Sequence, residues 1–135
     1  MAAYSNALSD RVTFIAGASI LTTTSYCRVG YISASMTCCL ASASSDDAIG
    51  IIDTTLSAGS DAVTVIMHGL ARGVMQSATA CAIGDWLVAD TMGSLDVALT
   101  NTTANQQIIG RALEVPATGG SVQIYVNIHA GGTIV

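Results

Sequence analysis

The chain has 135 residues, of which 51% are hydrophobic and only 10% are charged. Four arginines face nine carboxylates and there is no lysine, so the net charge is −5 at pH 7. This balance argues against a nucleic-acid partner, because binding to phosphates needs clustered cations. The absence of lysine excludes Schiff-base chemistry and lipoyl or biotinyl carrier domains. We expect a chain with this apolar content to be folded rather than disordered. Its weakly charged surface suits a protein that buries much of its surface against other chains.

The N-terminal stretch lacks the basic and apolar regions of a signal peptide, and no apolar run approaches the ~18 residues of a membrane-spanning helix. We therefore expect neither a signal peptide nor a membrane partner. Without a secretory signal, the four cysteines are expected to be buried, reduced thiols. Cys38 and Cys39 are adjacent, so they would point to opposite faces of a strand.

In chain order, residues 1–25 lack clean alternation, and we expect them to form an N-terminal arm or edge segment. Residues 61–69 (DAVTVIMHG) alternate apolar and polar side chains, which is typical of a half-buried strand. Residues 71–78 (ARGVMQSA) are predicted as another strand, and residues 82–85 (AIGD) as the tight turn that follows it. Residues 26–135 are thus predicted to form one β-rich domain.

The second half of the chain continues this pattern. Residues 85–100 predict two short strands joined by a turn at Asp90–Gly93. Residues 102–115 have partial helical spacing, which Pro116 would end. Residues 121–129 (SVQIYVNIH) alternate again, and a Gly-rich tail follows them. The fold class we predict is all-β, a small barrel or sandwich of short strands with an irregular N-terminal arm.

One phrase of the sequence occurs twice. Each copy holds an Ile-Gly pair, a polar loop that turns at glycine, and a strand of alternating Val or Ile. The matching positions are Ile49-Gly50 with Ile109-Gly110, Ala58-Gly59 with Thr118-Gly119, Val63 with Val122, and Val65 with Ile124. We interpret the copies as two related hairpins in the walls of one barrel, and chance similarity between β-rich segments is the alternative.

Candidate catalytic side chains are few. His68 and His129 are expected at strand ends facing solvent, and Asp46-Asp47 are expected to be solvated turn residues. Cys81 follows His68 closely enough for a thiol–imidazole pair, but no nucleophile motif, orienting carboxylate or oxyanion site accompanies them. No CxxC, HExxH, EF-hand or phosphate-loop pattern is present. We therefore predict no catalytic, metal or cofactor site, and rank an enzyme using Cys81 and His68 last.

Three residues are candidates for a subunit interface. Trp86 is the only tryptophan, and it is either a core or barrel-lid residue or an interface anchor. Arg72 and Arg111 lie among apolar or small residues. Each would pair with a carboxylate such as Asp85 or Glu114, or with an acidic group across a subunit boundary.

Residues 48–69, 77–98 and 107–127 together resemble the head-decoration, or capsid cement, proteins of tailed bacteriophages. The similarity covers about residues 46–128 and depends on the order and spacing of its turns. The positions that carry it are Ile49-Gly50, Gly59, Gly69, Gly84-Asp85, Asp90 to Gly93, Ile109 to Leu113, and Gly119-Gly120.

This resemblance implies a β-rich protein that sits as an oligomer outside an icosahedral shell and has no catalytic residues. We therefore expect a structural virion protein, made in the host cytoplasm, that binds the major capsid protein and stabilises the outer capsid surface. The resemblance favours a homo-oligomer, a trimer before a dimer. The alternative is a small β-barrel binding module for a sugar or peptide, whose groove would draw on one Trp, one Phe and four Tyr.

The N-terminal arm supplies the candidates for capsid contact. Arg11 would pair with a carboxylate on the shell, while Tyr4 and Phe14 would serve as apolar anchors. The alternative is that the arm packs on its own barrel or on a sister subunit.

Overall fold

A computed structural model describes residues 9–18, 20, 26–53, 62–76, 81–98, 106–116 and 122–134. These residues form nine β-strands and a single 3-10 turn, η1. The elements are β1 (Ser9–Ala16), β2 (Val29–Ala34), β3 (Thr37–Leu40), β4 (Ala48–Ile52), β5 (Ala62–Met75), β6 (Trp86–Ala89), η1 (Thr91–Gly93), β7 (Leu95–Val97), β8 (Gln106–Ala112) and β9 (Val122–Ile134). The predicted all-β class is confirmed. Within this described part, no helix has the length and apolar character needed to cross a bilayer.

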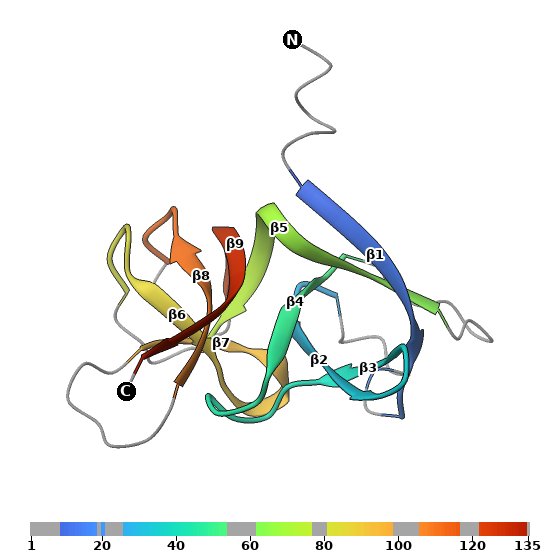
Figure 1. The fold of residues 1–135 in the computed structure, drawn as a ribbon. Helices are drawn as coiled ribbons and strands as arrows, with labels where there is room; N and C mark the ends of the chain where they lie inside the picture. The colour runs from blue at the N-terminus through green and yellow to red at the C-terminus, as the bar shows by residue number, and fades with distance from the viewer. Residues whose placement is uncertain are drawn as a thin grey trace, which may run out of the picture.

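The nine strands form one sheet that closes into two rings, which share the long strand β5 (Figure 1). The first ring runs β1-β3-β2-β4-β5 and closes through pairing of β1 with β5. The second ring runs β5-β7-β6-β8-β9 and closes through pairing of β5 with β9. Ala62 to Gly69 of β5 pair with β1, while His68 to Met75 pair with β9. A single strand of 14 residues therefore serves both rings.

The second ring repeats the topology of the first, strand by strand. Each ring opens with a parallel pair, β1–β3 or β5–β7, and its remaining pairs are antiparallel. The β2–β4 and β6–β8 pairs also carry a bulge at the same place. In each case the register skips one isoleucine, Ile49 or Ile109, which is the first residue of the repeated Ile-Gly phrase.

Backbone hydrogen bonds outside the strand ladders repeat as well. Four bonds of the first ring have a counterpart at the equivalent position of the second ring. The bonds of the first ring are Gly17 N to Cys38 O (2.8 Å), Cys27 N to Ile52 O (2.9 Å), Ile52 N to Arg28 O (2.8 Å) and Ala41 N to Val29 O (3.0 Å). Their counterparts, in the same order, are Gln76 N to Leu95 O (2.9 Å), Gly84 N to Ala112 O (2.8 Å), Ala112 N to Asp85 O (3.0 Å) and Ala98 N to Trp86 O (2.9 Å). The repeated phrase is thus part of a repeat of the whole fold.

The structure corrects the alignment of the two phrases after their loops. Val65 pairs with Ile52 in the first ring, and Val126 pairs with Ala112 in the second. Val65 therefore corresponds to Val126 rather than to Ile124. The shift is by two residues, which keeps the same face of the strand and so leaves the alternating pattern unchanged.

Buried side chains divide between the two rings. One cluster lies within the first ring and includes Phe14, Ile52 and Val65. A larger cluster fills the second ring and reaches the first, where it includes Val29 and Ile51. Ile51 and Ile52 are consecutive in β4 and point to opposite faces, so one packs toward the second ring while the other packs inside the first.

Four local predictions from sequence need correction. Residues 61–69 and 71–78 are not two strands, because β5 continues through Gly69 as it exchanges β1 for β9. Within residues 102–115, which have partial helical spacing, Gln106–Ala112 form strand β8 rather than a helix. Residues 9–16 of the expected arm form the regular strand β1, and residues 130–134 of the tail extend β9. The predicted turns are confirmed, since Ile83-Gly84 turn tightly and η1 joins β6 to β7.

Candidate functional site

The expected capsid contacts of residues 1–25 lie in different surroundings. Tyr4 is outside the residues that the structure describes. Phe14 is only 8% exposed and packs in the core of the first ring. Phe14 is therefore not an exposed anchor, because its ring closes the barrel to which β1 belongs. Arg11 is exposed on the same strand.

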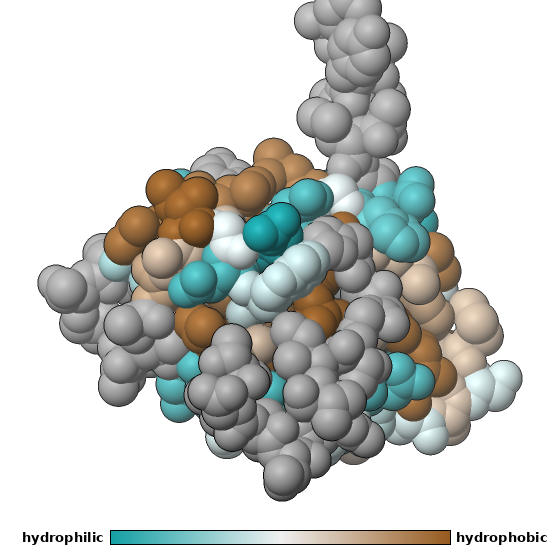
Figure 2. Space-filling view, turned by 60° about the vertical axis from the view of Figure 1, so that its left-hand side comes forward, coloured by the Kyte–Doolittle hydropathy of each residue, from teal (hydrophilic) through white to brown (hydrophobic). Residues whose placement is uncertain are grey.

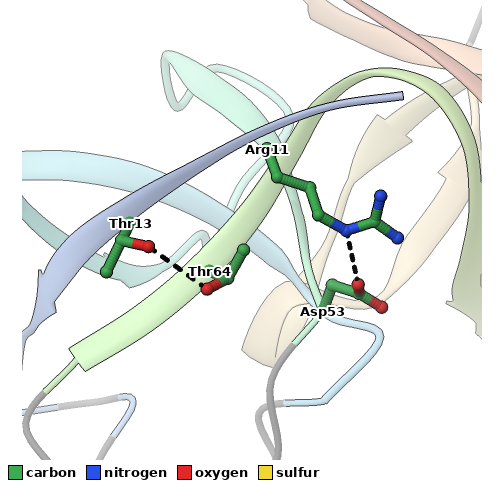
Figure 3. Close-up of polar contacts among 4 residues, drawn as sticks. All are labelled: Arg11, Thr13, Asp53 and Thr64. Atoms are coloured by element: carbon green, nitrogen blue, oxygen red, sulfur yellow. Dashed lines mark hydrogen bonds and ion pairs between the residues drawn. The ribbon is translucent and has the colours of Figure 1, made fainter. Parts of the chain in front are cut away.

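Arg11 forms an ion pair within the chain (Figure 3). Its Nε donates to Oδ2 of Asp53 at 2.9 Å, which joins β1 to the residue that follows β4. Next to it, the hydroxyls of Thr13 and Thr64 lie 3.4 Å apart across the β1–β5 pair. Both charged side chains are partly exposed, so solvent weakens their attraction. The carboxylate that Arg11 binds is thus one of its own chain.

Trp86 and Arg111 form an exposed cation–π pair at the start of β6. They are direct partners in the β6–β8 register, and the guanidinium carbon of Arg111 lies 4.5 Å from the centre of the Trp86 ring. Arg111 Nε also donates to the Gly84 carbonyl at 3.1 Å. The carboxylate of Asp85 accepts from the Ala82 backbone N–H at 2.8 Å. Arg111 is therefore held by a ring and a carbonyl rather than by the expected Asp85, and the pair stays at the surface.

Arg72 is half-buried on β5. Burial raises the pKa of the Cys27 thiol, and the nearby charge of Arg72 offsets part of that rise. Arg72 also opposes the rise in the pKa of Tyr26, which is caused first by the charge of Cys27. Arg72 thus contributes an internal charge beside Tyr26 and Cys27, where β5 passes from one ring to the other.

The two histidines lie within long strands and not at strand ends as expected. His68 of β5 and His129 of β9 are direct partners in the register. The His68 side chain is exposed, and its Nδ1 lies 3.5 Å from the carboxylate of Asp10. Cys81, by contrast, is buried in the larger core cluster, and its thiol donates to the Ala82 carbonyl at 3.6 Å. Burial raises the pKa of Cys81, which disfavours the thiolate that a nucleophile needs.

The acidic turn before β4 has a structural role. Asp46 Oδ2 accepts hydrogen bonds from the backbone N–H groups of Ser42 and Ala43, at 2.7 and 3.1 Å. This arrangement closes the loop on itself, as Asp does in many turns. Among the residues that the structure describes, no group of three His, Cys, Asp or Glu side chains could hold a metal ion. The four cysteines, all described, are free thiols; Cys27, Cys38 and Cys81 are buried as expected, whereas Cys39 is half-buried.

Large apolar side chains reach the surface of both rings, a feature that the alternating sequence pattern did not reveal. Figure 2 shows one face of the molecule, on which apolar side chains gather along the upper left rim beside polar ones. The exposed large hydrophobic residues are Ile15, Tyr26, Ile32, Met36, Leu70, Ile83, Trp86, Met92, Leu113 and Val115. Where such side chains form a contiguous patch, the patch commonly marks a site of contact with another protein.

No family model matches this sequence, and no curated protein is similar to it. The functional proposals below therefore depend on the geometry of the chain itself.

Proposed function

We propose that this chain is a structural virion protein that binds the outside of an icosahedral phage capsid and stabilises it. The observation that carries the proposal is the exposed apolar surface of both rings. Only 10% of the residues are charged, so this surface gains most when protein covers it. The partner would be the major capsid protein of a tailed phage, and the decorating form would be a homo-oligomer.

Stabilisation of the shell would follow from mass action. A protein that binds assembled capsid subunits but not free ones adds its binding free energy to the cost of opening the shell. At a hundred times the dissociation constant, each site adds about 2.7 kcal/mol. No reaction is needed, and a binding role agrees with the burial of Cys81, which raises the pKa of its thiol, and with the exposed position of His68.

The proposed capsid contact differs from the one that the sequence suggested. Phe14 is in the core and Arg11 pairs with Asp53, so we do not assign the contact to these two side chains. We assign the contact to the N-terminal residues 1–8, which include Tyr4, together with exposed apolar side chains such as Leu70. Leu70 lies on β5, one residue beyond the segment of that strand that pairs with β1.

The test is cosedimentation of the purified chain with undecorated capsids of the phage that carries its gene. Saturable binding, together with a higher unfolding temperature of the decorated shells, would support the proposal. A chain that stays in the supernatant at saturating concentration would overturn it. Quenching of Trp86 fluorescence by an oligosaccharide or peptide, without capsid binding, would favour the binding-module alternative.

A further inference from the structure

The contact between the two rings shows how one repeat of this fold seats on another. Gly93 of η1 meets the outer face of β2 so closely that a Cβ there would lie 2.8 Å from the Val29 carbonyl oxygen. Arg28 Nη1 reaches over the same turn and donates to the Met92 carbonyl at 3.0 Å. One end of the second ring thus rests on the outside of the first ring.

The outer face of β2 and β4, which we call the first wall, is covered by this contact at its central pair. Its central pair, Val29 and Ile51, is 0% and 1% exposed. The equivalent outer face of β6 and β8, the second wall, has Trp86 and Arg111 at the same register position, one pair away from the pair that borders the bulge. Trp86 is 38% exposed, and Arg111 is exposed as well. At this register position, the face that is buried on the first ring is therefore exposed on the second ring.

The end of the second ring that makes this contact is buried, whereas the equivalent end of the first ring is exposed. In the second ring this end includes Ala89 and Gly93, which are both buried. According to the registers of β2–β3 and β6–β7, Ala89 corresponds to Ile32 of the first ring, and Gly93 corresponds to Met36. Ile32 is 37% exposed and Met36 is 52% exposed. The exposed Ile15 adjoins them, since its backbone N–H donates to the Met36 carbonyl at 2.7 Å. We call these three residues the free end.

We propose that copies of this chain associate head to tail, with the free end of one copy seated on the second wall of the next. The contact would repeat between molecules the one that joins the two rings within each molecule. It is heterologous, because the free end and the second wall are different surfaces, so successive contacts build a closed ring or a filament.

The chemistry of the two surfaces fits this pairing. The free end is apolar, and the second wall offers an indole ring, against which the sulfur of Met36 packs favourably. Arg111 places a guanidinium on the second wall, and at the internal contact Arg28, the residue before β2, donates from its guanidinium to a turn carbonyl. The proposed contact between copies leaves a larger distance between the two backbones than the internal contact does, because Met36 has a side chain at the position that Gly93 occupies in the second ring.

The backbone conformation of Met36 is unusual for a side chain of this size. Its φ is 51°, in the left-handed region where a bulky side chain is uncommon. Glycine occupies the equivalent position of the second ring, at φ 72°. Met92 of η1 is similarly exposed and has a φ of 56°, so what distinguishes Met36 is its place beside the exposed Ile15 and Ile32.

The test measures self-association by sedimentation velocity over a range of protein concentrations. Wild-type chain is compared with Met36→Glu, which places a charge on the free end, and with Trp86→Glu, which places a charge on the second wall. Met92→Glu is the matched control, since Met92 is equally exposed, also has a positive φ, and lies outside both surfaces. Far-UV circular dichroism confirms that each variant is folded, and Arg111→Glu replaces Trp86→Glu if that variant does not fold.

We expect wild type and Met92→Glu to form the same oligomer, and each single-surface variant to bind itself about tenfold more weakly or worse. An equal mixture of Met36→Glu and Trp86→Glu retains one intact contact, so it should form a heterodimer that grows no further. A monomeric wild type, variants that assemble normally, or a mixture that stays monomeric would each overturn the proposal. No capsid is present, so this result is independent of capsid binding.

Discussion

Gly50 and Gly110 hold the same position in the two rings. A Cβ on Gly50 would lie 2.0 Å from the Ile66 carbonyl oxygen, and a Cβ on Gly110 would lie 2.1 Å from the Asn127 carbonyl oxygen. Each glycine directly follows the isoleucine that the bulge leaves out of the register. The repeated Ile-Gly phrase thus marks the place where β4 crosses close to β5, and where β8 crosses close to β9.

Substituting either glycine by alanine should destabilise the fold strongly. The added methyl group would collide with backbone, which moves only if the two strands separate. We expect Gly50→Ala and Gly110→Ala each to lower the free energy of unfolding by about 2–4 kcal/mol. Urea denaturation followed by circular dichroism measures this loss.

Gly84→Ala is the control for these two variants. Like Gly50, Gly84 has a positive φ, of 89°, but a Cβ there would meet only Arg111 Nη2, at 3.9 Å. Its cost should be limited to backbone strain, about 1–2 kcal/mol. Equal losses at all three glycines would contradict the role of close approach at Gly50 and Gly110.

The buried thiol of Cys38 should make stability fall at alkaline pH. Burial raises the pKa of Cys38 from 9.0 to about 12, because the folded core disfavours the thiolate. Below pH 9 the thiol is protonated in both states, so its contribution is fully present. Between pH 9 and about 12 the unfolded chain ionises first, and stability is lost as pH rises, by at most about 1.4 kcal/mol per pH unit from this thiol.

Urea denaturation from pH 8 to pH 11 provides the measurement. Cys38→Ala should be less stable at every pH because it leaves a cavity, but its stability should fall less steeply than that of wild type. Parallel pH profiles for the two proteins would show that Cys38 does not titrate as its burial predicts.

The ion pair between Arg11 and Asp53 should contribute little to stability. Although Nε and Oδ2 lie 2.9 Å apart, both side chains are partly exposed. A double-mutant cycle with Arg11→Ala and Asp53→Asn should give a coupling of about 0.2–1 kcal/mol. Because the pair is screened, the coupling should shrink when the salt concentration is raised to about 1 M. A larger coupling that salt does not change would mean that the pair is shielded from solvent.

Two N-terminal truncations should behave differently. A chain that starts at Ser9 keeps β1, so we expect it to fold and, under the proposed function, to bind capsids less tightly. A chain that starts at Ile20 loses β1, which pairs with both β3 and β5 and places Phe14 in the core. We expect this second chain to lose its cooperative thermal transition in calorimetry. A cooperative transition near that of the full chain would show that the first ring closes without β1.

The sequence by itself determined the all-β class, the turns at Ile83-Gly84 and at η1, and the presence of a repeat around Ile49-Gly50 and Ile109-Gly110. These features depend on local chemistry, namely alternating apolar side chains and the residues that turns require. Side-chain periodicity reports which residues are half-buried, but it does not report which strand lies next to which.

Only the tertiary structure decided that β5 is one strand shared by two rings, that Phe14 is in the core, and that Trp86 is exposed where its counterpart Val29 is buried. The strand segments 29–32 and 38–41 match 86–89 and 95–98 in backbone pairing and hydrogen bonds, yet their side chains have little in common. The physical reason is that hydrogen bonds between strands join backbone groups, so the same ring can form from different side chains. Burial, in turn, depends on what packs outside each ring, which no local pattern records.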